Sequence, residues 1–289
     1  MYIVLAFLLL LQVNDITSFT IKSNLKSNRI HRFTVLRAQN DIKFQSVKIL
    51  ENKDEAIDLK SISIEVTDEI QEAYSTPGQY VQMKVGDGKP GFYAIASPPL
   101  SETSSASNQM SFLIKETENN HWLTRADVGT LVDMSIALGK GFKIEENFDE
   151  YKFDFPTMRV VMMACGSGIA PIAAAIESDC LKLKESGYNS LFPRQGVLYL
   201  GARTSKHIPF QSRFKAWEDK GVQVIPVLSQ PEPDWTGRKG YIQDALKEDG
   251  VEVPRNSGVL LCGQRGMVDD VKELLLSEGV FEGRILLNF

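Results

Sequence analysis

The 289-residue sequence predicts two domains of different class, a six-stranded antiparallel β-barrel followed by an α/β domain with a five-stranded parallel sheet. The length suits two domains, because a single domain averages about 150 residues. Short β-rich runs separated by polar turns fill the first half, a pattern typical of small barrels. After Pro156, apolar strand candidates alternate with helical stretches, which indicates a parallel sheet covered on both faces. We therefore expect a barrel at residues 41–155 and an α/β domain at residues 156–289.

The strands expected in the barrel are rich in β-branched, aromatic and aliphatic residues and are bounded by turn-forming residues. They are Phe44–Leu50, Leu59–Val66, Gln79–Val85, Phe92–Ser97, Met110–Lys115 and Leu131–Leu138. The polar stretch 117–127 has helical potential. The stretch 101–108 is rich in serine and threonine and is expected to be a surface loop.

In the α/β domain, strands and helices are expected to alternate along the chain. The expected strands are Arg159–Ala164, Val197–Leu200, Val222–Leu228, Val259–Cys262 and Ile285–Leu287. The expected helices are Pro171–Lys184, Gln211–Lys220, Tyr241–Lys247 and Met267–Ser277. The last of these is amphipathic, with an apolar side formed by Val268, Val271, Leu274 and Leu275.

The first 40 residues have the composition of a targeting leader. Ile3–Leu11 is an apolar run long enough for a signal-peptide core but too short for a membrane span, which needs ~20 residues. Residues 19–40 contain five cations, many hydroxyl groups and no carboxylate, as organelle transit peptides do. We therefore expect a signal peptide at 1–18, a transit peptide at 19–40, a plastid location and no span in the mature protein. Simple secretion is the alternative.

Charge and cysteine content exclude several classes of protein. The net charge of −5 becomes −9 without residues 1–40, which hold five cations and one carboxylate, so nucleic acid and acidic membrane surfaces are not expected partners. The three cysteines, Cys165, Cys180 and Cys262, form no Cys-x-x-Cys pair. This argues against a disulfide framework and against a zinc or iron–sulfur site, and no metal is expected.

A glycine-rich turn joins the first expected strand of the α/β domain to its first helix. Its residues are Gly166, Ser167, Gly168, Ile169, Ala170 and Pro171. Glycines let the backbone approach a diphosphate, and a helix N-terminus offers free N–H groups and the positive end of its dipole. The turn is therefore predicted to bind a dinucleotide. The steric demand of a tight strand-to-helix turn is the alternative reason for its glycines.

A second turn of the same kind follows the strand Val259–Cys262 and includes Gly263 and Met267. In a parallel sheet both turns lie at the carboxyl edge, where ligands bind. We therefore expect Cys262 to face the same ligand as Gly166. The alternative for Cys262 is a small buried hydrophobic residue.

Taken in order, these turns make residues 41–289 resemble the ferredoxin-NADP reductase family, and within it the group of plant and algal flavoproteins. The family's Gly-Thr-Gly-Ile-Ala-Pro loop matches Gly166–Pro171, and its Cys-Gly-Pro segment matches Cys262–Gln264. Pro77–Tyr80 and Gly201–Arg203 also match segments of the family. The resemblance implies a Greek-key barrel that binds FAD and an α/β domain that binds NADH or NADPH.

The flavin motif is where the sequence departs from the family. The family's Arg-x-Tyr-Ser falls on Gly91–Ala94, so the arginine that pairs with the FAD diphosphate and the serine near flavin N5 are both missing. Each loss removes ~1–3 kcal/mol of hydrogen bonding. Tyr93 is retained and is implied to lie against the flavin. Lys89 would supply a replacement charge, and the alternative is that it is a solvated surface lysine.

The resemblance implies a set of site residues, which also includes a phosphate contact near Asn120–Thr124 and a terminal aromatic, Phe289, beside the flavin. Packing against the core is the alternative for Phe289. The catalytic residues are expected to be Cys262 and Tyr93. The cofactor-binding residues are expected to be Tyr93, Ile95, Ala96, Ser97, Asn120, Thr124, Gly166, Ser167, Gly168, Ile169, Ala170, Pro171, Arg203, Gly263, Met267 and Phe289.

The choice between NADH and NADPH is expected to depend on the turns after the second and third strands of the α/β domain. These turns contain Arg203, Thr204, Lys206, Ser229, Arg238 and Lys239. No acidic residue directly follows Gly201-Ala202, which favours NADPH, because NADH usually meets a carboxylate at the ribose. An ordinary solvated face is the alternative for these cations.

The function predicted from these residues is an FAD-dependent oxidoreductase that passes a hydride from NAD(P)H to FAD and then electrons to an unidentified acceptor. The protein is expected to be a monomer. One alternative is a non-enzymatic nucleotide-binding or electron-transfer accessory subunit, because Gly91 and Ala94 lack the family's flavin contacts. Another is a flavin or quinone reductase.

Overall fold

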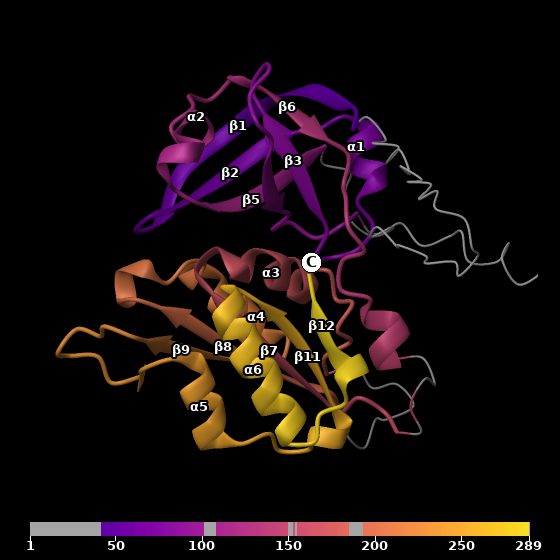
Figure 1. Cartoon of the computed structure of the whole chain (residues 1–289), viewed down its shortest axis with the longest axis vertical. Coiled ribbons are helices and arrows are strands. Elements are labelled where there is room, and N and C mark those ends of the chain that lie inside the picture. Colours follow the sequence, from indigo (N-terminus) through magenta and orange to yellow (C-terminus); the bar gives the residue numbers. More distant parts are fainter. Residues whose placement is uncertain (1–41, 101–107, 150–152, 154, 185–192, 289) are drawn as a thin grey trace, which may run out of the picture. The chain divides into compact units, whose positions relative to one another are not determined.

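In the computed structural model, two six-stranded sheets follow one another along the chain (Figure 1). The structure describes residues 42–100, 108–149, 153, 155–184 and 193–288. The first sheet contains β1 Phe44–Ala56, β2 Leu59–Glu65, β3 Tyr80–Lys84, β4 Gly91–Ala94, β5 Gln109–Lys115 and β6 Leu131–Ser135. The second contains β7 Arg159–Cys165, β8 Gln195–Ala202, β9 Val222–Leu228, β10 Arg238–Lys239, β11 Ser257–Cys262 and β12 Ile285–Leu287.

The first sheet is antiparallel throughout, with the strand order β4-β3-β6-β1-β2-β5. Its two edges meet through a bridge between Ile95 and Phe112, and this bridge closes the sheet into a barrel. Alternating residues of β5, such as Met110, Phe112 and Ile114, point into the barrel core and are buried. The six strands expected from the first half of the sequence are therefore all present.

Two features of the barrel differ from the expectation. β1 continues to Ala56, past the expected end at Leu50, because its polar second half pairs with β2 in a long hairpin. An unexpected helix, α1 Asp68–Ala73, follows β2. Thr67 begins this helix, since its hydroxyl accepts a hydrogen bond from the Ile70 N–H. The short helix α2 His121–Thr124 lies within the stretch that was expected to have helical potential.

The second sheet is parallel, with the order β10-β9-β8-β7-β11-β12. All five expected strands form, and β9 and β12 have the expected bounds. The structure adds a sixth, β10, which pairs with the end of β9. Its two residues are too few to produce a hydrophobic pattern, so the expected count of five was too low.

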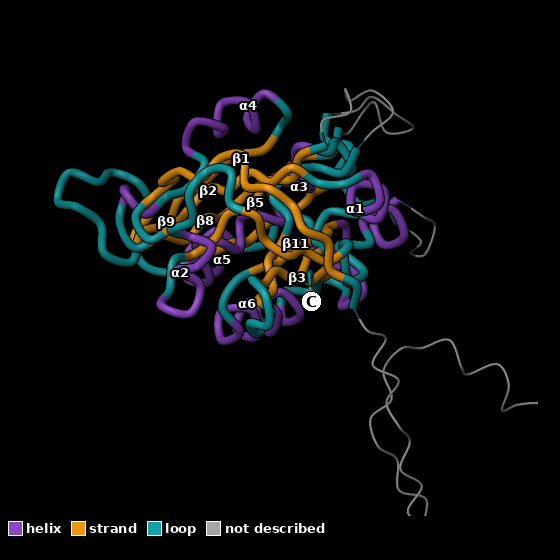
Figure 2. Tube along the Cα trace, turned by 90° about the horizontal axis from the view of Figure 1, so that it is seen from above, coloured by secondary structure: helices purple, strands orange, loops and turns teal. Residues whose placement is uncertain are grey.

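Helices cover both faces of this sheet. They are α3 Ile169–Glu177, α4 Phe214–Asp219, α5 Ile242–Asp249 and α6 Arg265–Ser277. α3 and α4 pack against one face, and α5 and α6 pack against the other, so α4 and α6 lie on opposite sides of the strands in Figure 2. The expected apolar side of α6 is confirmed, since Val268, Val271 and Leu275 are buried. None of the described helices is long and apolar enough to cross a membrane.

The predicted helix Pro171–Lys184 is wrong beyond Glu177, where α3 ends. The Ser178 hydroxyl and the Cys180 thiol both donate to the carbonyl of Ala175, which satisfies the end of the helix. Asp179 and Lys182 then have positive φ angles of 60° and 50°, which a continuing helix does not allow.

Candidate functional site

The glycine turn after β7 has the backbone that its sequence predicts. Gly166 has φ of +55°, a left-handed conformation that glycine adopts without steric cost, and residues Gly166–Gly168 form one 3-10 turn before α3. A Cβ placed on Gly166 would meet no atom within 4 Å. The backbone of the turn is therefore open on this side.

Gly168 brings the two predicted turns together. A Cβ at this position would overlap the carbonyl oxygen of Cys262 and lie 2.9 Å from its carbonyl carbon and 3.2 Å from the Cα of Gly263. Only glycine fits such an approach of two backbones. Gly168 and Cys262 are 94 residues apart in the sequence. The turns after β7 and β11 therefore touch at the carboxyl edge of the sheet, as expected.

Other predicted members of the first turn are core residues. Ile169, Ala170 and Pro171 are buried under the sheet, and the apolar cluster that contains Ile169 and Ala170 also contains Leu113 of the barrel. Their side chains pack in the core at the start of α3. Gly166, Ser167 and Gly168 are half-buried, so any contact from this turn comes from its first three residues.

Cys262 is buried and uncharged. Burial, and to a lesser extent the neighbouring Cys165, raises the pKa of the Cys262 thiol to about 12. Burial likewise raises the pKa of Cys165 to about 11. Near neutral pH both groups are thiols, so neither is poised as a thiolate nucleophile. Gly263 follows Cys262 and is covered by Met267, because the Met267 Cε lies where a Cβ on Gly263 would be.

On β4 the aromatic ring of Tyr93 lies over Gly91. A Cβ on Gly91 would be 2.5 Å from the Tyr93 Oη and 2.8 Å from its Cζ. Tyr93 is half-buried, and burial raises the pKa of its phenol. The ring therefore occupies the space through which a longer side chain at position 91 would leave the strand.

The residues after β4 serve the closure of the barrel. Ile95 and Ala96 are buried, and their N–H groups donate to the carbonyls of Gln79 and Ser111. Ser97 accepts the Ser111 N–H at its hydroxyl and the Tyr74 hydroxyl at its carbonyl. The side chains of Ile95 and Ala96 thus pack in the core, and the cofactor contacts implied for these residues stay a prediction.

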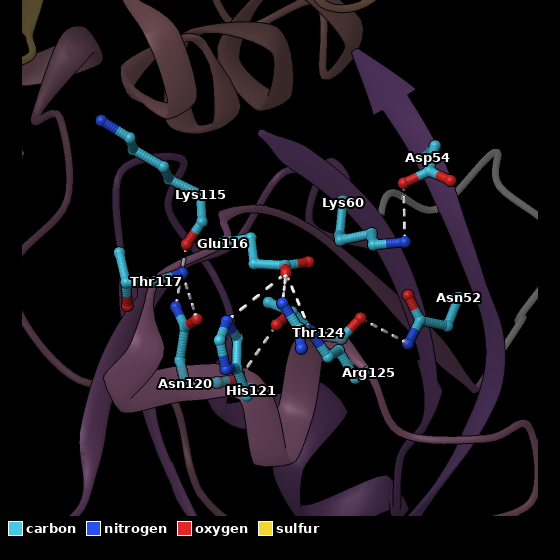
Figure 3. Close-up of polar contacts among 10 residues, drawn as sticks. All are labelled: Asn52, Asp54, Lys60, Lys115, Glu116, Thr117, Asn120, His121, Thr124 and Arg125. Atoms are coloured by element: carbon cyan, nitrogen blue, oxygen red, sulfur yellow. Dashed lines mark hydrogen bonds and ion pairs between the residues drawn. The ribbon is translucent and has the colours of Figure 1, made fainter. Parts of the chain in front are cut away.

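The predicted phosphate contact near α2 is also used internally (Figure 3). The Asn120 side chain accepts the Thr117 N–H at 2.8 Å and donates to the Lys115 carbonyl at 2.8 Å, which caps its own turn. Thr124 is fully buried and its hydroxyl donates to the Asn120 carbonyl. Asn52 of β1 donates to the carbonyls at the end of α2, including that of Thr124. Thr124 therefore has no exposed surface for a cofactor.

A charged cluster surrounds Glu116, beside α2. Its carboxylate accepts two hydrogen bonds from Arg125 and lies 3.4 Å from the His121 ring, and these contacts, those of Arg125 above all, lower its pKa. Lys115 extends away from this cluster in Figure 3. Lys115 lies two residues after Leu113, so both side chains are on the face of β5 that packs near α3.

Two of the four cations expected to choose the dinucleotide, Arg203 and Arg238, face carboxylates. Arg238 pairs with Glu248 and Asp249 of α5. Arg203 lies 4.0 Å from Asp58, which belongs to the tip of the β1–β2 hairpin. The Thr204 hydroxyl is 2.8 Å from Nδ1 of His207.

Sequence reasoning missed two acidic residues of this region. Glu55, in the β1–β2 hairpin, accepts the Phe210 N–H at 2.8 Å, and Glu232, in the loop after β9, binds Ser205. They are 155 and 27 residues from their partners, so no local pattern indicates either contact.

The comparison with known protein families agrees with this geometry. The family model for the oxidoreductase NAD-binding domain matches residues 162–273, which include both glycine turns. The match also includes Ser205 and Glu232, in the turns after β8 and β9.

Relatives of known name and structure extend the similarity to the barrel. The chain is 33% identical over 224 residues to the fruit protein pKIWI502 of Actinidia deliciosa, a match that covers 74% of this chain and 66% of that protein. It is 22% identical over 231 residues to the anthranilate 1,2-dioxygenase electron transfer component of Acinetobacter baylyi, covering 78% and 60%. The chain thus spans less than two thirds of the length of either relative.

Among solved structures, a ferredoxin NADP+ reductase from Neisseria gonorrhoeae with bound FAD and NADP superposes with a TM-score of 0.67 at 20% identity, covering 85% of this chain and 98% of that one. The fold is therefore that of the ferredoxin-NADP reductases, and the resemblance expected from the sequence is confirmed. Phe289 and the expected leader lie outside the described residues.

The residues present fit a nicotinamide dinucleotide more completely than they fit a flavin. The turns after β7 and β11 offer an open glycine backbone and a buried, neutral cysteine. On the barrel, Tyr93 offers a half-buried aromatic ring, but β4 carries no cation, and the N–H groups of Ile95 and Ala96 are occupied. Within the described part of the chain, no group of three or more His, Cys, Asp or Glu residues is placed to hold a metal.

Proposed function

We propose that this chain is an oxidoreductase that binds NAD(P)H on its α/β domain and FAD on its barrel, and passes electrons to an acceptor still to be identified. The close approach of Gly168 to Cys262 carries this proposal, because it joins a phosphate-type turn to a second turn at one sheet edge. When bound, the two cofactors supply the hydride chemistry, and the protein contributes binding, orientation and exclusion of water.

The diphosphate of the dinucleotide would lie on the backbone of Gly166, Ser167 and Gly168, and the nicotinamide would border Cys262. A protonated, uncharged thiol suits that position, because it neither repels nor reacts with an uncharged ring. Tyr93 would lie against the flavin. Lys115 would supply a cation toward the glycine turn, since β5 contacts Gly166–Gly168.

A second candidate function is supported by the barrel. Gly91 and Ala94 lack the side chains of the family motif, and barrel closure uses the backbone of the residues after them. A protein that binds the dinucleotide but not FAD would be an accessory subunit without flavin chemistry. The two functions predict different flavin contents, so the purified protein distinguishes them.

The test is anaerobic reduction of the FAD-loaded protein by NADH and NADPH, followed by flavin absorbance. We expect Cys262→Ser to slow reduction by about tenfold while FAD occupancy is unchanged, because the substitution alters only the surface under the nicotinamide. The matched control is Cys180→Ser, since Cys180 follows the far end of α3. Equal rates in the wild type and Cys262→Ser would make Cys262 a packing residue. A colourless protein that takes up NADH but no added FAD would support the accessory subunit.

We further propose, from the sequence alone, that residues 1–40 direct the protein to a plastid and that the mature protein is a monomer with a domain boundary near residue 155. These proposals rest on the leader's composition and on the change from barrel strands to α/β alternation.

A further inference from the structure

The loop after β9 places a carboxylate inside the turn after β8. Glu232 Oε1 accepts the Ser205 hydroxyl at 2.8 Å, and both of its carboxylate oxygens lie 3.2 Å from the Ser205 N–H. Pro231 and Pro233 flank Glu232 and restrict its backbone. The backbone N–H of Trp235 donates to the Glu232 carbonyl, and the Trp235 ring packs against the core under the sheet. The carboxylate is therefore held in position without a ligand.

The position of this turn in the sheet indicates which part of a dinucleotide would reach it. β7 lies between β8 and β11, and the glycine turn after β7 contacts β8 and touches Cys262 at the end of β11. A dinucleotide with its diphosphate on that turn would extend its two halves in opposite directions. If the nicotinamide borders Cys262, the adenosine half extends toward the ends of β8 and β9.

In α/β domains that bind dinucleotides, an acidic side chain at the end of the second strand accepts the ribose 2′-hydroxyl of NADH. A cation at the same place accommodates the 2′-phosphate of NADPH. Here the second strand is β8. The Ser205 N–H and hydroxyl are donors that would suit a phosphate, and Glu232 already occupies them. Hydrogen bonds from its own backbone and from Ser205 lower the pKa of Glu232, so it is ionised at neutral pH.

Two of the four cations near this turn, Arg203 and Arg238, are also opposed by carboxylates. Asp58 faces Arg203, and Glu248 and Asp249 pair with Arg238. A 2′-phosphate would thus meet one fixed carboxylate at Ser205, two arginines that already face carboxylates, and the exposed Lys206. A ribose hydroxyl, in contrast, donates to a carboxylate.

We propose that Glu232 is a specificity-determining residue that selects NADH over NADPH, by accepting the adenosine ribose hydroxyls and excluding a 2′-phosphate from the Ser205 donors. The inference rests on the proposed function. It reverses the preference for NADPH drawn from the lack of an acidic residue after Gly201-Ala202, because the acidic residue comes from the next loop of the sheet.

The test measures binding of two adenosine fragments, 5′-AMP and 2′,5′-ADP, by calorimetry on the intact protein, beside kcat/KM for NADH and NADPH. The wild type should prefer 5′-AMP and NADH. Glu232→Gln keeps a hydrogen-bonding side chain but removes the charge, and should move the 2′,5′-ADP to 5′-AMP affinity ratio by about tenfold toward 2′,5′-ADP. Asp58→Asn, which frees Arg203 and tolerates the positive φ of 62° at this position, should shift the ratio in the same direction by less.

Asp234→Asn is the matched control, because it removes an exposed carboxylate from the same loop without touching Ser205, and its ratio should equal that of the wild type. A wild type that prefers 2′,5′-ADP, or an unchanged 2′,5′-ADP to 5′-AMP affinity ratio in Glu232→Gln, would overturn the inference. The proposed function would stand in that case, because the protein would still bind the fragments and NADH. Failure of the wild type to bind NADH and both fragments would overturn the two together.

Discussion

Gly91 and Tyr93 show how one missing side chain changes the role of its neighbour. They lie two residues apart on β4, so both face the same side of the strand, and the Tyr93 ring covers the hydrogen atoms of Gly91. The clashing atoms of Tyr93 are at the far end of a flexible side chain. A larger residue at position 91 would therefore displace the ring at small cost and leave the strand intact.

Restoring arginine at this position tests what its loss means. We expect Gly91→Arg to bind FAD at least about tenfold more tightly than Gly91→Ala, because a charge-assisted hydrogen bond to a diphosphate is worth roughly 1.5–3 kcal/mol. The alanine variant is the control, since it displaces Tyr93 without adding a charge. Dissociation constants from flavin fluorescence titration provide the measurement. Equal constants in the two variants would mean that position 91 does not face the FAD diphosphate.

The polar tip of the β1–β2 hairpin binds the loop after β8. Its Ile57 N–H donates to the Lys206 carbonyl at 3.0 Å, and Glu55 accepts the N–H of Phe210. Phe210 is buried and has a positive φ of 59°, a conformation uncommon for an aromatic residue. The hairpin thus fixes the loop after β8, which also carries Arg203 and Ser205.

Removing the Glu55 carboxylate should destabilise the protein. We expect Glu55→Ala to lower the free energy of unfolding by ~1–3 kcal/mol, because the buried Phe210 N–H would lose its acceptor. Urea unfolding followed by tryptophan fluorescence measures this. Asp54→Ala is the control: its side chain is 83% exposed and pairs with Lys60 at the surface, where an ion pair contributes ~0–1 kcal/mol. If the free energy of unfolding fell equally in both variants, the contact of Glu55 with Phe210 would stabilise the protein no more than a surface ion pair does.

At the scale of the whole molecule, burial of two thiols at the carboxyl edge makes stability depend on alkaline pH. The pKa values of Cys165 and Cys262, about 11 and about 12, exceed the ordinary value of 9.0 because Cys262 is buried and Cys165 is partly buried. Above pH 9 the unfolded chain loses these two protons while the folded chain keeps them. The unfolded state then binds fewer protons, so the free energy of unfolding falls as pH rises.

The corresponding experiment compares the wild type with the double variant Cys165→Ala and Cys262→Ala across pH 7 to 11. The stabilising contribution of the thiols is fully present below pH 9 and is lost as the pH rises toward 11 and 12. We therefore expect the variant's unfolding free energy, from urea melts, to fall less steeply above pH 9. Parallel curves for the two proteins would contradict the burial of these thiols.

The sequence by itself determined the architecture and the position of the two glycine turns. Strand and helix periods are local, and parallel strands place their carboxyl ends at one edge, so Gly168 and Cys262 could be expected to share a site. The same reasoning found Tyr93 and the missing arginine at Gly91, because both follow from matching one short motif.

Only the tertiary structure decided which of the predicted site residues are buried in the core. Ile95, Ala96 and Thr124 occur in motif positions, yet barrel closure and packing bury them. Glu232 and Ser205 are 27 residues apart, and Glu55 and Phe210 are 155 apart. Such contacts depend on which strands become neighbours and how loops fold over the sheet edge, and local sequence patterns report only residues a few positions apart.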